Sequence, residues 1–97
     1  MVLLEDLGKD LGDEYVLVKI SRDIRFMDEI EEKIKEKDPI KLIGWGNAIN
    51  LVVRLALDAR DKLSLKIDDI KIGTQEEVEM KNNRVRPLSW MEITMKK

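Results

Sequence analysis

Apolar and polar residues alternate with two different periods along the chain, and the switches between these periods predict its elements. Residues 15–20 alternate and are rich in β-branched side chains, which is typical of a strand. Residues 26–38 place Met27, Ile30 and Ile34 at helical spacing, with Glu and Lys around the rest of the surface. The first half of the chain therefore predicts a strand followed by an amphipathic helix.

The later segments continue the alternation of strands and helices. They are a short strand over residues 40–43, a helix over about 47–62, a strand over 65–74 and a strand over 90–95. Asn82-Asn83 suits a tight turn because Asn tolerates positive φ, so the last two strands are expected to extend into a long hairpin.

The order βαβαββ predicts an α/β fold of the two-layer sandwich type. A strand–helix–strand unit implies a right-handed crossover and a parallel pair of strands. We expect a four-stranded mixed sheet with both helices on one face.

Composition narrows the function classes. The 97 residues fit one domain and include no Cys and no His. Disulfides, thiolate metal sites and a thiol nucleophile are therefore absent, as is the usual acid–base group near neutral pH. The carboxylates of residues 28–38 have no metal-ligand or cleft pattern and are expected to form a solvated helix face. We expect a protein that is not an enzyme and has no metal and no cofactor.

No apolar stretch reaches membrane-spanning length, and no signal peptide is evident. A cytoplasmic protein without a membrane partner is the expectation.

The net charge of −2 is unevenly distributed. Residues 1–14 carry five acids and one base, whereas residues 80–97 carry five bases and one acid. We interpret residues 1–14 as a loosely ordered acidic lead-in to a domain over residues 15–97. Such a lead-in is expected to compete with phosphate for basic loops.

The second predicted helix is apolar on two faces. Asn50, Arg54 and Asp58 form one narrow polar stripe, and apolar residues cover most of the remaining surface. One face can lie on the sheet, and the other is covered either by the first helix or by a partner chain. We favour the partner, most simply in a symmetric dimer. The predicted interface residues are Leu51, Val52, Leu55 and Ala59.

Gly44-Trp45-Gly46-Asn47 lies between a strand and this helix. A dinucleotide fingerprint is incomplete here, because Ile49 stands where a third glycine is required. The segment also fits a tight turn with Asn47 as the helix N-cap. A third interpretation is a contact with nucleic acid, in which backbone N–H groups face a phosphate and Trp45 lies on a sugar or base.

Three segments carry a resemblance to a known family: "GNAINLVV" (46–53), "DDIKIGTQEEVEM" (68–80) and "SWMEITM" (89–95). They resemble the Alba family of small archaeal chromatin proteins, in the same element order over roughly residues 15–97. The resemblance implies a dimer joined through the second helices and last two strands, with two long hairpins as arms along nucleic acid. Relatives include protein subunits of RNase P, so DNA, RNA or both are implied as partners, with a nucleoid-associated location.

The resemblance also implies where nucleic acid is contacted, although Asp23, Trp45 and Asn47 stand where family members usually have basic residues. The candidate contacts are Arg22, Arg25, Gly44, Trp45, Gly46, Asn47, Lys81, Arg84 and Arg86. The leading hypothesis is a non-enzymatic, dimeric, sequence-independent nucleic-acid-binding protein. The alternative is an assembly subunit that binds mainly protein, such as the weakly basic half of a heterodimer with an Alba-like paralogue.

Overall fold

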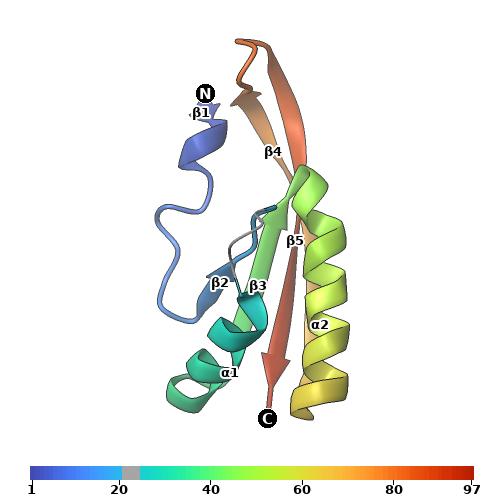
Figure 1. Cartoon of the computed structure of the whole chain (residues 1–97). Coiled ribbons are helices and arrows are strands. Elements are labelled where there is room, and N and C mark those ends of the chain that lie inside the picture. The colour runs from blue at the N-terminus through green and yellow to red at the C-terminus, as the bar shows by residue number, and fades with distance from the viewer. Residues whose placement is uncertain (21–24) are drawn as a thin grey trace.

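The computed structural model describes residues 1–20 and 25–97, and within them five strands form one mixed sheet (Figure 1). The elements in order are β1 (Val2–Leu3), the 3-10 turn η1 (Leu4–Asp6), β2 (Tyr15–Leu17), α1 (Phe26–Glu36), β3 (Ile40–Trp45), the 3-10 turn η2 (Gly46–Ala48), α2 (Ile49–Leu63), β4 (Lys66–Glu79) and β5 (Val85–Lys96). The strand order across the sheet is β1-β4-β5-β3-β2. From β2 onward this is the predicted element order, with the predicted parallel pair formed by β2 and β3.

The prediction of four strands is wrong because the acidic segment adds a fifth. Val2 pairs with Val78 and Leu3 pairs with Glu79, so β1 lies parallel to the far end of β4. Within residues 1–14, Val2 and Leu3 pair with β4 and Leu7 is only 7% exposed, whereas Lys9, Asp10 and Asp13 are exposed. The apolar residues at the start of this segment therefore pack against the end of the sheet, a feature that its acidic charge obscured.

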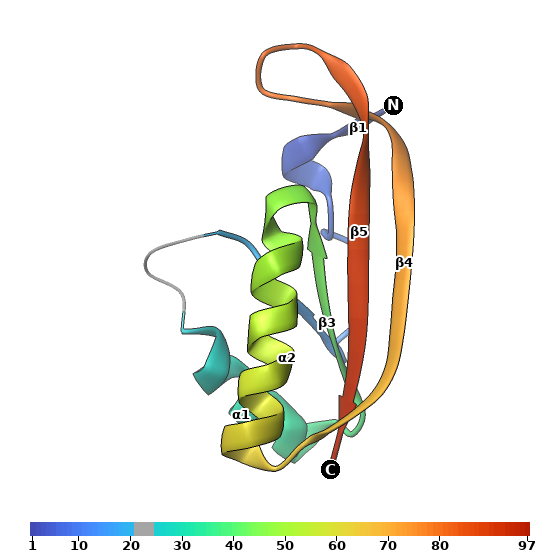
Figure 2. The same ribbon diagram turned by 90° about the vertical axis from the view of Figure 1, so that its right-hand side faces the viewer.

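The two helices share one hydrophobic core with the sheet, which we call the main core. Ile30 of α1, Val52 of α2 and Leu42 of β3 are all completely buried in it. Viewed in Figure 2, α2 lies in front of the sheet, with α1 beside its C-terminal half. The helices therefore cover the same face of the sheet, as the sequence predicts. None of the helices in the described ranges is long and apolar enough to cross a membrane.

Strands β4 and β5 form an antiparallel hairpin that extends beyond the start of α2 (Figures 1 and 2). The chain reverses between them with Asn83 at a φ of 63°, and the Asn83 N–H donates to the Met80 carbonyl at 3.0 Å. The Arg84 N–H donates to Asn82 Oδ1 at 3.1 Å. The predicted Asn82-Asn83 turn is confirmed, because both side-chain hydrogen bonding and positive φ are properties of Asn.

A second, smaller cluster of apolar residues lies at the base of the hairpin, and we call it the arm cluster. Its buried members are Leu7, Val78 and Leu88, with Val2, Leu4, Trp45 and Met80 partly buried against them. The pairing of β4 with β5 shifts between Gln75 and Val78, where Glu77 has a φ of 54°. This bulge bends the hairpin and reorients the residues that follow it. The end of the hairpin therefore closes over the N-terminal segment, as Figure 2 shows.

Candidate nucleic-acid interface

A groove of about 410 Å³ lies where the arm cluster meets the start of α2. Four parts of the chain line it: η1, the end of β2, the turn η2 and the base of the hairpin. Its walls are largely apolar, and the apolar lining residues include Leu4, Leu7, Leu17, Val18, Met80 and Leu88. The groove is thus a recess between segments that are far apart in the sequence.

The described residues that line this groove include three cations: Lys19, Lys81 and Arg86. All three are exposed, and none forms an ion pair with another residue that the structure describes. Glu5 is the one carboxylate among the described lining residues. The described residues of the groove therefore carry an excess of positive charge in a chain whose overall net charge is −2, and such an excess favours an anionic ligand.

Trp45 packs half-buried against the arm cluster and also lines the groove. Its Nε1 is buried and has no hydrogen-bond acceptor among the described residues. An unpaired buried donor costs about 1–3 kcal/mol. Trp45 therefore both packs in the arm cluster and lines the groove.

The three neighbours of Trp45 have different environments. Gly44 is buried, and a Cβ there would lie 2.7 Å from Val52 Cγ2, so this glycine lets α2 pack closely on β3 and leaves no surface for a phosphate. Gly46, at a φ of 56°, lines the groove. Asn47 also lines it and is exposed, but it is not a helix cap. The N-cap of α2 is Ala48, already helical and without a side-chain capping bond, because the 3-10 turn η2 runs directly into the helix.

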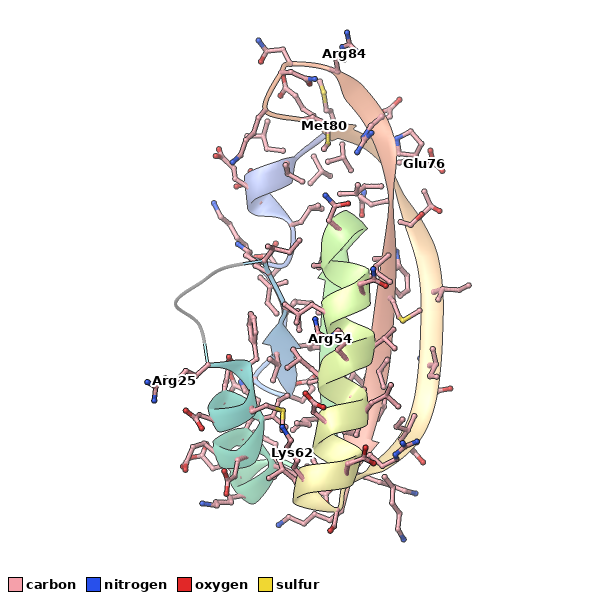
Figure 3. All side chains as sticks on the ribbon, turned by 45° about the vertical axis from the view of Figure 1, so that its right-hand side comes forward. Arg25, Arg54, Lys62, Glu76, Met80 and Arg84 are labelled. Atoms are coloured by element: carbon pink, nitrogen blue, oxygen red, sulfur yellow. The ribbon has the colours of Figure 1, made fainter. Side chains whose placement is uncertain are left out.

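The predicted arginines separate into different places. Arg84 is exposed at the tip of the hairpin, and Arg25 is exposed at the start of α1, far from that tip (Figure 3). Arg22 lies outside the described residues. The structure thus brings Lys81 and Arg86 together with Trp45 and the turn η2, which we call the Trp45 turn. Arg25 lies away from this group.

The predicted interface residues of α2 lie within the chain itself. Val52, Leu55 and Ala59 are buried in the main core, and Leu51 is partly buried against it. Because the sheet and α1 already cover these side chains, they offer little surface to a partner.

Another apolar surface flanks α2 on its β4 side. Ile70 is 55% exposed and Ile72 is 72% exposed, and their antiparallel partners Ile93 and Met91 belong to or pack against the main core. Cross-strand partners share a face of the sheet, so both isoleucines point to the side on which α2 lies. Leu57 of α2 is 38% exposed, and α2 contacts β4. We call Leu57, Ile70 and Ile72 the apolar flank.

A polar cluster connects β2 to β5 across β3. The Tyr15 hydroxyl donates to Glu92 Oε1 at 2.7 Å, and Lys41 Nζ lies 5.4 Å from the centre of the Tyr15 ring. This hydrogen bond, followed by burial and the nearby Glu92 charge, raises the pKa of Tyr15 to about 12. The cluster gives the buried Glu92 a donor. Within the described part of the chain, no group of three or more carboxylates is placed to hold a metal ion.

Lys19 and Leu7 are among the groove residues that the sequence analysis did not predict. Lys19 was included in a strand over residues 15–20, but β2 ends at Leu17, so Lys19 lies beyond the paired part of the strand. Leu7 lay in a segment interpreted only by its charge, although its apolar spacing to Leu4 was visible. The partial covering of the groove by η1 depends on long-range pairing that local patterns do not reveal.

Comparisons with known proteins show the fold. No family model matches the sequence, and no curated protein matches it. The structure is similar to the crystal structure of ALBA1 from Trypanosoma brucei, with a TM-score of 0.73 and 20% identity over 91% of this chain and 72% of that chain. It is also similar to Alba from Thermoplasma volcanium, with a TM-score of 0.66 and 18% identity over 86% of this chain and 99% of that chain. The chain therefore has the fold of Alba proteins, which confirms the resemblance at the level of the fold.

Proposed function

We propose that this protein is a non-enzymatic nucleic-acid-binding protein that acts as a dimer and contacts mainly the phosphate backbone. The observation that carries the proposal is the groove, where Lys19, Lys81 and Arg86 surround the Trp45 turn on an Alba fold. Backbone phosphate is the ligand that such cations attract, whatever the base sequence. A cytoplasmic, nucleoid-associated role belongs to the same proposal.

The hairpin supplies a second part of the contact surface. Arg84 at its tip and Arg86, two residues further along the chain, are both exposed, as is Lys81 on the other side of the turn. Within residues 80–91 there is no acid, although Glu76, Glu77 and Glu79 lie on the paired strand β4, so the positive charge is concentrated at the turn and the start of β5. A strand of nucleic acid can follow the hairpin from its tip to the groove.

The apolar flank supports the dimer. Leu57, Ile70 and Ile72 would lose favourable burial if they stayed in water, and each large aliphatic side chain gains about 1.5–3 kcal/mol when buried. A second copy of the chain, related by a two-fold axis, covers this surface and places two hairpins on one assembly. Two sets of cations then act together on one nucleic acid.

Direct binding tests the function. The unmodified protein is titrated into labelled duplex DNA and structured RNA at low salt, while sedimentation measures its oligomeric state. Arg86→Ala is expected to weaken binding to every sequence alike. Arg60→Ala is the matched control, because Arg60 pairs with Asp61 at 3.0 Å near the opposite end of α2 and should have little effect. Equal losses in both variants would contradict a role for the groove.

A second candidate is an assembly subunit that binds mainly protein, including a more basic paralogue. The observation in its favour is the surface of α1, on which Glu29, Glu31, Glu32 and Glu36 are all exposed. The helix also carries Lys33 and Lys35, but its net charge is negative, so its surface suits a basic protein partner better than it suits nucleic acid. A dimer that binds no nucleic acid but forms a stable complex with a basic chain of the same fold would favour this candidate.

A further inference from the structure

We propose that the groove accepts one unstacked nucleotide from a single-stranded or looped nucleic acid, with its base against the apolar walls and its phosphate among the cations. The inference rests on the proposed function and deepens it, because it assigns the groove a ligand that a stacked duplex cannot provide.

The lining of the groove has two chemical parts. Leu4, Leu17 and Leu88 give it apolar walls, while Lys19, Lys81 and Arg86 place positive charge around them. A duplex presents phosphates outward and keeps its bases stacked inside, so it would satisfy the cations and leave the walls unfilled. An unstacked nucleotide carries both parts in one unit, a flat base with apolar faces and an anionic phosphate.

Trp45 is the aromatic residue of this surface. Bases stack on aromatic side chains in many single-stranded complexes, without regard to sequence. Its Nε1 has no acceptor among the described residues, and every base carries carbonyl or ring-nitrogen acceptors. When the surrounding side chains shift to admit a base, this donor can gain the partner it lacks.

Charge complementarity selects a nucleotide over a neutral aromatic ligand. Among the described residues, three cations and one carboxylate line the groove. Glu5 is suited to accept a hydrogen bond from the amino or imino group of a base, and the three cations are suited to the phosphate. RNA and DNA offer the same chemistry, so the tests use both.

The first test compares ligands on the unmodified protein. Short unstructured oligonucleotides of uridine or thymidine are compared with an abasic oligonucleotide of the same length and charge. We expect the oligonucleotides with bases to bind at least about fivefold more tightly than the abasic chain. A preference for uridine would indicate RNA, and equal affinities would indicate both. Equal binding of the abasic chain would overturn the inference.

The second test observes the groove directly. The chain contains two tryptophans, so Trp90→Phe leaves Trp45 as the single tryptophan reporter. The ring of Trp90 lies over Gly73, and the smaller Phe ring fits the same place. Oligonucleotides with bases should quench Trp45 fluorescence, whereas saturating duplex or abasic chain should not. Trp45→Phe, which keeps Trp90, is the matched control and should show no quenching.

Different results would contradict the nucleotide site and the proposed function. If every nucleic acid binds and Trp45 fluorescence stays unchanged at saturation, the nucleotide site is wrong and the proposed function remains. If no nucleic acid binds, both are wrong. Should Trp90→Phe fail to fold, the abasic comparison on the unmodified protein still decides the question.

Discussion

The main core and the arm cluster are both hydrophobic, but they are built in different ways. The main core joins α1, α2 and the central strands through fully buried residues such as Ile30, Leu42 and Val52. The arm cluster joins an N-terminal segment to the base of the hairpin. Its Val78 directly follows the bulge at Glu77, and its tryptophan has a buried donor with no acceptor among the described residues. The first has the regular features of a structural core, whereas the second combines packing with strain and charge.

This difference indicates that the two clusters have different roles. Residues in a sparsely populated backbone region and unpaired buried donors are costly, and they are often found at functional sites. Here both features lie beside the groove and its cations. We infer that the main core holds the fold and that the arm cluster adjusts the hairpin for binding.

Truncation of one leucine in each cluster should have the largest effect on stability and should distinguish the two clusters. Leu42→Ala removes a fully buried side chain from the main core and should lower the free energy of unfolding by about 2–5 kcal/mol, measured by urea denaturation. Leu7→Ala should cost about 2 kcal/mol and act locally, by releasing residues 1–14 while α2 keeps its hydrogen-exchange protection. Loss of protection throughout the chain in Leu7→Ala would show that the two clusters unfold as one unit.

Substitution in the apolar flank should have the next largest effect, on the stability of the dimer. Ile72→Glu puts a charge into the surface that a second copy covers and should weaken the dimer by about a hundredfold in sedimentation experiments. Arg54→Glu, on the exposed polar stripe of α2 (Figure 3), is the matched control and should leave the mass unchanged. A parent protein that sediments as a monomer would contradict the proposed dimer.

The Tyr15–Glu92 hydrogen bond should contribute a smaller, pH-dependent amount. Tyr15→Phe should lower the free energy of unfolding by about 1 kcal/mol at neutral pH. Because the folded-state pKa is raised to about 12, above the ordinary value of 10.0, this contribution is complete below pH 10 and is lost as pH rises through about 12. The difference between parent and variant should therefore shrink between pH 10 and 12. A difference that stays constant across that window would contradict the assignment.

The acidic residues of the N-terminal segment should have the smallest effect. Deletion of residues 1–14 would also remove Leu7 from the arm cluster, so neutralisation is the cleaner change. Glu5→Gln with Asp10→Asn should tighten binding to duplex DNA at low salt by about threefold, an effect that salt removes by screening. Glu31→Gln with Glu36→Gln, on α1, controls for net charge. Equal tightening in both pairs would show that only the total charge matters.

Local patterns were sufficient for most of the main core. The spacing of Met27, Ile30 and Ile34 placed α1 correctly, and Asn82-Asn83 placed the reversal of the hairpin. These features depend on neighbours within a few residues, which periodicity and turn chemistry describe well. The strand, helix and hairpin order was therefore predictable from the sequence.

The arm cluster and the groove depended on contacts that the sequence does not display. β1 is two residues long and pairs with residues more than seventy positions away, and the bulge at Glu77 has no glycine to mark it. The site was consequently predicted in part. Lys81 and Arg86 lie with the Trp45 turn as a set, whereas Gly44 serves packing and Lys19 was not among the candidates.

The salt dependence of binding is the most direct test of the proposal that a dimer binds the phosphate backbone of nucleic acid. If the two subunits of a dimer neutralise about four phosphates, the slope of log K against log salt for duplex DNA should be about −3.6. Replacing Arg84 and Arg86 with Ala should flatten it by about one unit for each lost contact, while Arg60→Ala leaves it unchanged. A folded dimer with no measurable binding to duplex DNA or structured RNA at about 50 mM salt, where phosphate contacts are strong, would contradict the account.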